Sequence, residues 1–404
     1  MRRGKPLRVF MAVANNPYPR DTRVRLEAES LSAGGFEVTV AAPRAEGEAP
    51  TEVVNGVKVI RYRMPNFGVG VGSYVLEFAY VTLTTFIACM KEWFHFGVDV
   101  IHLHNPPDSL VLAAVLPRLF GKKVVFDHHD LAPELYQTKF DGGRAGSRLV
   151  VGSLRFLEWL SCRLAHQVIV VNDSYKRIDI ERNGVSESAV TIVRNGPPLG
   201  QLERVDPDPD LLARASFIIG YLGNIAKQDG VDHLLKALHQ LQSSFGFDDW
   251  FAVIIGPIEE PSGLTELATE LGISSKIWFA GYRPVEEWRR LLATVDVACV
   301  PDPSNPLNDK STMVKMMEYM ALGKPVVAYD LPENRATGGS AALYARASDP
   351  HSFAAELNLL RNNPQVAHDL GDAAKERVRS GLAWEFSEVK LLGLYENLER
   401  SLRN

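Results

Sequence analysis

Short apolar runs alternate with amphipathic segments along the first half of the chain. Runs of strand length, rich in β-branched residues, lie at 7–14, 37–43, 57–63, 98–104, 124–129, 168–172 and 191–194. Helical periodicity lies between most of them, at 23–33, 75–94, 109–120, 147–165 and 174–183. Strands that alternate with helices predict a doubly wound, mostly parallel α/β sheet.

The pattern breaks at 195–210 and then begins again. This segment holds Gly-Pro-Pro and Asp-Pro-Asp-Pro-Asp, which continue neither a helix nor a central strand, so we interpret it as a linker. Strand-like runs follow at 217–222, 251–255, 276–280, 297–301, 325–329 and 342–344, with helical patterns at 231–242, 263–271, 285–293, 313–321, 352–362 and 365–380. The sequence therefore predicts two Rossmann-like domains, at 1–198 and 199–383, which face an interdomain cleft, followed by an amphipathic helix at 384–404.

Composition agrees with this organisation. A chain of 404 residues is too long for one ordinary core, and 46% apolar with 23% charged residues is typical of a globular protein. A net charge of −5 gives no global attraction for nucleic acid. Cys89, Cys162 and Cys299 are far apart, so they suggest neither a disulfide framework nor a metal motif, and they favour a reducing compartment. No cleavage pattern follows the first apolar run, so we expect no signal peptide.

The segment at 74–90 is apolar enough to be tested as a membrane span. Glu77 interrupts it and its length is marginal, so we interpret it as a buried helix. The alternative is a peripheral contact with a membrane through Trp93, Phe94 and Phe96.

In the first half, the candidate residues follow the strands, because ligands of open α/β sheets bind at the carboxyl ends of strands. Arg20 lies after the first strand, where no GxGxxG motif is present. Arg20 and its neighbours Arg23 and Arg25 either meet an anionic acceptor or only cover the first helix. His104 begins the loop after the strand at 98–104.

The densest group of ionisable residues is Asp127-His128-His129-Asp130, with Glu134 close behind. Two adjacent histidines at a strand end point in opposite directions, which disfavours a shared metal. We expect one histidine, with Asp130 or Glu134, to provide hydrogen-bonding groups at the cleft. The alternative is that Asp130 caps the following helix, and the two roles need not exclude each other.

In the second half, a phosphate loop is suggested by the segment from Gly223 to Gly230. Glycine permits close backbone approach, the following helix start favours phosphate, and Lys227 adds charge. Further on, Ser311 or Thr312 is the expected N-cap of the helix at 313–321, a role that competes with ligand binding.

That helix carries Lys315 and Glu318 three residues apart, so they share one face. A helix start offers N–H groups to a phosphate, and a carboxylate further along can accept hydrogen bonds from two ribose hydroxyls. The same spacing also fits a buried helix with one solvated ion pair, and spacing alone leaves both interpretations open.

Together these positions resemble the retaining nucleotide-sugar glycosyltransferases of the GT-B fold, in the large family four (glycosyl transferases group 1). The resemblance covers nearly the whole chain. Its motifs are HHDLAPE at 128–134, VRNG at 193–196, GYLGN at 220–224 and KMMEYMALGKPVVA at 315–328.

The resemblance implies specific roles. It implies that Glu318 binds the ribose and that His129 faces the donor sugar. It assigns the remaining donor-binding positions to Asn195, Gly223, Asn224, Lys227, Ser311, Thr312, Met313 and Val314. The acceptor side is then left to Arg20, His104, Asp130 and Glu134, and the C-terminal helix is expected to return to the first domain.

The chain departs from the family pattern at charged positions. Many members have an acidic residue where this chain has Lys310, an Arg where it has Asn224, and a Lys where it has Asp229. We infer that Lys315 and Lys227 supply the positive charge for the leaving diphosphate, with no metal. The implied reaction is front-face transfer with retention, in which catalysis stabilises the departing diphosphate.

The resemblance implies no cofactor, because the nucleotide sugar is a co-substrate, with UDP favoured over GDP. The expected acceptor is a saccharide or a lipid-linked saccharide of polysaccharide or glycoconjugate synthesis. The expected location is the cytoplasm, with the inner face of the plasma membrane as a variant. Two alternatives stay open: a nucleotide-sugar epimerase of GT-B type, which would use His104, Asp130 and Glu134, and an inactive homologue that still binds nucleotide.

Overall fold

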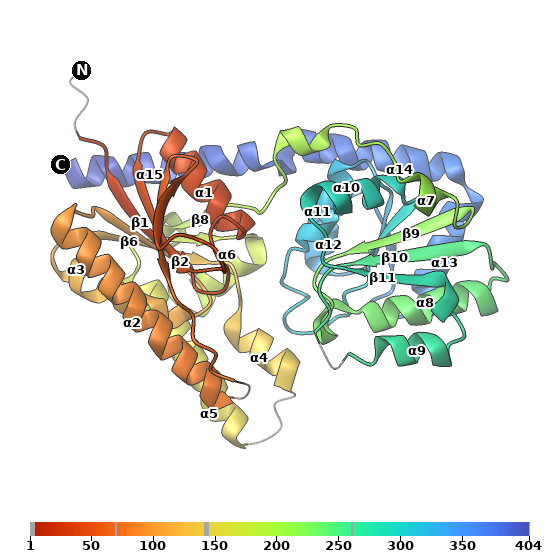
Figure 1. Cartoon of the computed structure of the whole chain (residues 1–404), viewed down its shortest axis with the longest axis horizontal. Helices are drawn as coiled ribbons and strands as arrows, with labels where there is room; N and C mark the ends of the chain where they lie inside the picture. Colours follow the sequence, from red (N-terminus) through yellow and green to blue (C-terminus); the bar gives the residue numbers. More distant parts are fainter. Residues whose placement is uncertain (1–4, 69–70, 141–144, 260–261, 404) are drawn as a thin grey trace. The chain divides into compact units, whose positions relative to one another are not determined.

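The structure is a computed structural model, and it describes residues 5–68, 71–140, 145–259 and 262–403. The chain divides into two compact units (Figure 1). Unit 1 comprises 1–194 and 387–404, and unit 2 comprises 195–386. The boundaries predicted from the sequence, 198/199 and 383/384, lie a few residues from the observed ones. The C-terminal segment 387–404 belongs to unit 1.

Unit 1 is built on an eight-stranded sheet whose spatial order is β3-β4-β2-β1-β5-β6-β7-β8. All neighbours are parallel except β3, which pairs antiparallel with β4. The strands are β1 (Arg8–Ala12), β2 (Glu37–Pro43), β3 (Thr51–Val54), β4 (Val57–Tyr62), β5 (Val100–His104), β6 (Lys123–His128), β7 (Gln167–Val170) and β8 (Val190–Ile192).

Helices cover both faces of this sheet. Figure 1 shows α1 and α15 on one side and α2, α3 and α5 on the other. The connection through α1 (β1 to β2) and the one through α2 (β4 to β5) run in opposite directions across the sheet, so right-handed crossovers place these two helices on opposite faces. The helices are α1 (Thr22–Ala33), α2 (Val71–His95), the 3₁₀ helix η1 (Asp108–Ala114), α3 (Val115–Leu119), α4 (Ala132–Phe140), α5 (Ala145–Leu164), α6 (Asp173–Glu181), η2 (Glu187–Ala189) and α15 (Trp384–Arg403), which begins in unit 2.

Unit 2 has a six-stranded parallel sheet in the order β11-β10-β9-β12-β13-β14. Its strands are β9 (Phe217–Leu222), β10 (Trp250–Ile255), β11 (Ile277–Gly281), β12 (Val297–Val300), β13 (Val326–Tyr329) and β14 (Leu343–Ala345). Its helices are η3 (Leu199–Leu202), α7 (Pro209–Leu212), η4 (Lys227–Asp229), α8 (Val231–Ser243), α9 (Leu264–Glu270), η5 (Ser274–Lys276), α10 (Val285–Thr294), α11 (Val314–Ala321), α12 (Pro332–Gly338), α13 (Pro350–Asn362), α14 (Pro364–Arg377) and the π-helical turn η6 (Val378–Leu382).

The sheet of unit 2 separates two hydrophobic cores. Successive strand residues point to opposite faces, so Ile219 joins one core and its neighbour Ile218 joins the other. The core that includes Ile219 packs under α8 and α13, and the other packs under α10 and α11. Both faces are apolar, which explains why the strands read as continuous apolar runs.

The structure adds elements that the sequence pattern did not predict. The edge strand β3 is short and half polar, and α4, α7 and α12 carry too few turns for a clear periodicity. The expected helix at 109–120 is instead a 3₁₀ helix followed by the short α3. The expected linker is partly ordered as η3 and α7, with Asp208 capping α7.

The interpretation of α2 as a buried helix was wrong. Within the described residues, one helix, Gly72–His95, is long and apolar enough to cross a membrane, and only 22% of its apolar window is buried. One stripe of α2, which includes Val81 and Cys89, packs into the core of unit 1, and its other faces stay exposed.

Candidate nucleotide and acceptor sites

The helix α11 carries Lys315 and Glu318, which the sequence analysis predicted to share one helix face. Glu318 lies in its second turn and keeps part of its surface exposed. Among the residues that the structure describes, no hydrogen bond or ion pair of the Glu318 carboxylate is found. The carboxyl is nevertheless enclosed by protein atoms, and this burial raises its pKa to about 7, although the nearby Lys315 opposes the shift.

Lys315 is buried at the centre of a polar cluster at the carboxyl end of the sheet. Its Nζ donates to Asp302 Oδ1 at 2.8 Å and to the Tyr221 hydroxyl at 3.1 Å, and lies 3.5 Å from Asp229 Oδ1. Burial alone would lower the pKa of Lys315, but Asp302 outweighs this and holds it well above its usual value. The lysine therefore stays charged, and two carboxylates balance its charge.

Gly223 allows the loop after β9 to approach this cluster. Its φ of 152° lies outside the range that side chains adopt easily, and an added Cβ would lie 3.1 Å from Lys315 Cε. The backbone of Gly256 also lies against the carbonyl of Gly223. The structure thus places Gly223 beside Lys315, although the two residues lie far apart in the sequence.

The start of α11 differs from the predicted one. The N-cap is Met313, whose thioether is only a weak acceptor, and its side chain makes no capping hydrogen bond. Ser311 instead donates its hydroxyl to the Leu307 carbonyl at 2.9 Å. The Thr312 hydroxyl donates to Glu333 at 3.4 Å. The prediction that Ser311 or Thr312 is the N-cap was therefore wrong.

The remaining donor-side candidates and Lys310 differ in exposure. Asn224 and Lys227 are exposed between β9 and α8. Asn195 is half-buried, beside the close contact of Gly196 with the Leu382 carbonyl. Lys310, which replaces the usual acidic residue, is half-buried in the loop before α11.

The sequence reasoning missed two members of the Lys315 cluster. Asp302 is almost fully buried two residues after the end of β12, and burial raises its pKa despite the adjacent lysine. Tyr221, the penultimate residue of β9, donates its hydroxyl to the Asn224 carbonyl at 2.7 Å and so fixes the loop. A carboxylate that closely follows a buried strand was the available signal for Asp302.

The charged residues that follow the strands of unit 1 include a buried network of ion pairs around Arg23. Arg23 on α1 donates from Nε and Nη2 to both oxygens of Asp127 at 2.7 and 2.8 Å. Its Nη1 donates to the Val193 carbonyl at 3.0 Å, and its Nη2 lies 3.1 Å from Glu27. Arg23 therefore neither meets an acceptor nor covers the helix surface.

His104 lies between Glu27 and the backbone of β1 in this network. Its Nδ1 must donate to the Ala12 carbonyl at 3.2 Å, and its Nε2 lies 3.0 Å from Glu27 Oε2. One proton is needed between those two atoms, because an unprotonated nitrogen and a carboxylate would repel each other. Burial, together with Asp127, raises the pKa of Glu27, which agrees with such a proton.

The side chains of Glu27, His102, His104 and Asp127 lie close enough to hold one metal ion. However, the guanidinium of Arg23 already binds both carboxylates and neutralises one charge. We therefore interpret this group as an internal ion network. A second group of this kind, His128, Cys162 and Asp179, is joined by hydrogen bonds through Asp179.

The two adjacent histidines point in opposite directions, as the strand geometry predicted. His128 Nδ1 lies 2.9 Å from Asp179, whereas His129 Nδ1 lies 3.4 Å from Asp127. The side chain of His129 is 13% exposed, so it can reach a ligand. Burial would lower the pKa of His129, but Asp127 outweighs this and raises it.

Two acceptor-side candidates require correction. His104 is fully buried within the ion network, and Glu134 is 3% exposed with an Arg182 ion pair at 2.6 Å. Neither has a surface from which to contact a substrate. Arg20 is exposed and Asp130 is half-buried, so both remain accessible. Because α4 begins at Ala132, Asp130 lies before its N-cap position.

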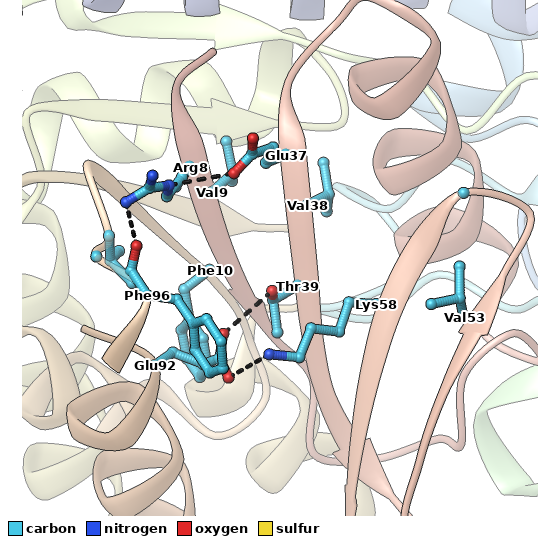
Figure 2. A pocket seen from close by; sticks show the side chains of 13 residues that line it. Arg8, Val9, Phe10, Glu37, Val38, Thr39, Val53, Lys58, Glu92 and Phe96 are labelled. Carbon is cyan, nitrogen blue, oxygen red and sulfur yellow. Dashed lines mark hydrogen bonds and ion pairs between the residues drawn. The ribbon is translucent and has the colours of Figure 1, made fainter. Parts of the chain in front are cut away.

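A separate cavity of about 270 Å³ lies in unit 1 and is an unsuitable candidate (Figure 2). It lies at the amino ends of β1 and β2, opposite to the carboxyl ends where ligands of such sheets bind. Its charged side chains are already paired, Arg8 with Glu37 at 3.1 Å and Lys58 with Glu92 at 2.6 Å.

Comparisons with known proteins agree with this architecture. The family model described as Glycosyl transferases group 1 matches residues 207–377, and the Glycosyl transferase 4-like domain matches 21–196. D-inositol 3-phosphate glycosyltransferase of Corynebacterium urealyticum is 26% identical over 95% of this chain and 90% of its own. Two solved structures also match, but at 17% and 15% identity they inform the fold alone.

Sucrose-phosphate synthase from Thermosynechococcus elongatus has a TM-score of 0.79 at 17% identity, covering 98% of this chain and 100% of that one. HepE of Anabaena, in complex with UDP-glucose, has a TM-score of 0.70 at 15% identity, covering 97% and 100%. Two parallel-sheet α/β units of this kind form the GT-B fold. The chain belongs to family four of these enzymes, the glycosyl transferases group 1.

Proposed function

We propose that this enzyme transfers a sugar, with retention and without a metal, from a UDP-sugar whose nucleotide binds unit 2. The observation that carries the proposal is Glu318 on the helix α11, a partly exposed residue whose carboxylate has no hydrogen bond or ion pair with any residue that the structure describes. Two neighbouring ribose hydroxyls would supply the hydrogen bonds that the protein does not.

The surroundings of Glu318 suit a diphosphate. The N-cap of α11, Met313, makes no side-chain capping hydrogen bond, and N–H groups at a helix start attract phosphate. Gly223 brings the backbone of the β9 loop close, and Lys227 offers an exposed cation in that loop. Preorganised dipoles and lysines can stabilise the charge of a leaving diphosphate without a metal.

Replacing Glu318 with glutamine is expected to weaken UDP binding by about 10- to 100-fold, because hydrogen bonds to a charged group contribute roughly 1.5–3 kcal/mol. Titration calorimetry with UDP measures this change. Glu270→Gln, an exposed acid on α9, is the matched control and should bind as the parent protein does. An unchanged affinity in Glu318→Gln would refute the ribose assignment.

The affinity for UDP is also expected to fall as the pH drops through about 7. Burial raises the pKa of Glu318 to about 7, so the carboxylate that accepts from the ribose is present above this pH and lost below it. Phosphate groups titrate near pH 6 as well, but equally for every variant. The pH dependence should therefore be steeper for the parent protein than for Glu318→Gln, and identical profiles would contradict the assignment.

The epimerase alternative loses support from the positions of its expected residues. His104 and Glu134 are buried and engaged in internal contacts, which leaves Asp130 without the partners of an acid/base set. Incubation of UDP-glucose alone separates the alternatives, since an epimerase would form the epimer without an acceptor. Retained UDP binding without transfer to any acceptor would indicate an inactive homologue.

For the acceptor we propose a saccharide or a lipid-linked saccharide, which would contact Arg20 and Asp130 of unit 1. The name of the Corynebacterium urealyticum relative specifies an inositol phosphate acceptor. An anionic acceptor of this kind would suit the positive charge of Arg20. Cys89, Cys162 and Cys299 are all free and buried, which supports a cytoplasmic location. A thermal-shift screen of UDP- and GDP-sugars would identify the donor before any acceptor is known.

A further inference from the structure

The helix α2 presents an apolar stripe away from the body of unit 1. Leu76, Leu83, Ile87 and Phe94 recur on one side of the helix and are 62%, 58%, 43% and 72% exposed. The opposite stripe, which includes Val81 and Cys89, is fully buried in the core. A soluble helix would carry polar residues on its outer stripe, so this helix is apolar where it should meet water.

Two neighbouring elements extend the same apolar surface. The 3₁₀ helix η1 packs against both α2 and α5, and Phe120, after α3, contacts Trp93 of α2 with ring centroids 5.4 Å apart. Leu119 and Phe120 are 77% and 67% exposed. On α5, Leu149, Phe156 and Trp159 share the outer side of the helix and are all exposed. Figure 1 places α2, α3 and α5 on one side of the sheet.

The charges on these helices are sorted by sign. Arg148, Arg155 and Arg163 of α5 are exposed, as is Lys91 of α2. The acidic residues point inward: Glu92 is buried against Lys58, and Glu158 is buried against Arg182. Of the acids on these helices only Glu77 keeps some exposure. The surface is therefore basic, on a chain whose net charge is −5.

We propose that this surface of α2, α3 and α5 docks on a lipid bilayer that carries anionic headgroups. Exposed apolar side chains would enter the headgroup region, and the arginines would bind the lipid phosphates. Because the Val81 stripe of α2 is fixed in the core, the helix would lie along the membrane plane and would not cross it. The proposal does not depend on the nucleotide site of unit 2.

Vesicle sedimentation tests the docking surface. The full chain is expected to sediment with vesicles of phosphatidylcholine and phosphatidylglycerol, far less with phosphatidylcholine alone, and less as salt screens the arginines. The double substitution Leu83→Glu with Ile87→Glu is expected to lower the partition coefficient at least about tenfold, since two apolar side chains no longer enter the bilayer. Both positions are exposed, so the unit should still fold, and thermal melting checks this.

The control is Leu359→Glu on α13 of unit 2, where the leucine is 40% exposed and should not affect partition. Absence of binding to the anionic vesicles would overturn the proposal, and so would an equal loss in the control. Self-association in sedimentation velocity that the double substitution abolishes, without vesicle binding, would instead make the surface an interface between copies. UDP titration of the same variants reports separately on the nucleotide site.

Discussion

Replacing Lys315 with methionine is expected to slow sugar transfer by about 100- to 1000-fold, the range typical for loss of one group that stabilises transition-state charge. The Lys315 ammonium lies beside Gly223, and Gly223 belongs to the loop where we propose that the diphosphate binds. Its charge is held by Asp302 at 2.8 Å and is therefore present throughout the neutral pH range. Steady-state turnover of UDP-glucose, as transfer or as hydrolysis, measures the effect.

A second variant separates catalysis from charge balance within the protein. Lys315→Met alone leaves Asp302 buried without a cation, which also destabilises unit 2. Adding Asp302→Asn removes that carboxylate and should restore the melting temperature. If the lysine serves the diphosphate, the double variant stays folded and slow. Recovery of full turnover would show that Lys315 only compensates Asp302.

Most of the fold was predictable because the signals are local. The strands of unit 2 are buried on both faces, so β9 and β10 read as unbroken apolar runs within a residue or two of their observed bounds. The edge strand β3 was missed because it is exposed and lacks such a run. The exposed stripe of α2 was misjudged because apolar composition alone does not distinguish a core from a docking surface.

The candidate site was only partly predictable. Lys315 and Glu318 share a helix face, which their spacing in the sequence already indicates. The partnership of Lys315 with Asp302 and Tyr221 depends on the order of β9 and β12 in the sheet, which no local pattern encodes. The N-cap was wrong because Ser311 finds a backbone acceptor in its own loop, a contact that competes with capping.

In unit 1 the sequence indicated where the charged residues gather but not that they form an internal ion network. Residue type and position after a strand made His104 a candidate for substrate contact. The structure shows that its neighbours Glu27 and Asp127 face an arginine from α1, so the cluster is internal. Arg23 and Asp127 lie too far apart in the sequence for a local pattern to indicate this pairing. Because Arg23 lies on α1 and Asp127 on β6, the ion network holds α1 against the sheet.

Replacing Arg23 with methionine is expected to lower the stability of unit 1 by about 3–5 kcal/mol, because removing one partner leaves buried charges uncompensated. Asp127 and Glu27 are both fully buried and would lose the same cation. For a unit of about 200 residues this corresponds to a fall in melting temperature on the order of 10 °C. Thermal unfolding followed by circular dichroism measures it.

Arg25→Met is the matched control, since Arg25 lies on the same helix with a half-exposed side chain and a loose ion pair to Glu29 at 3.6 Å. It should change stability by less than about 0.5 kcal/mol. The Arg23 effect should also shrink at low pH. Arg23 holds the pKa of Asp127 well below its usual value, so this stabilisation is present above the unfolded pKa near 4 and lost as the pH falls. Equal melting temperatures for the two variants would show that the buried network contributes nothing to stability.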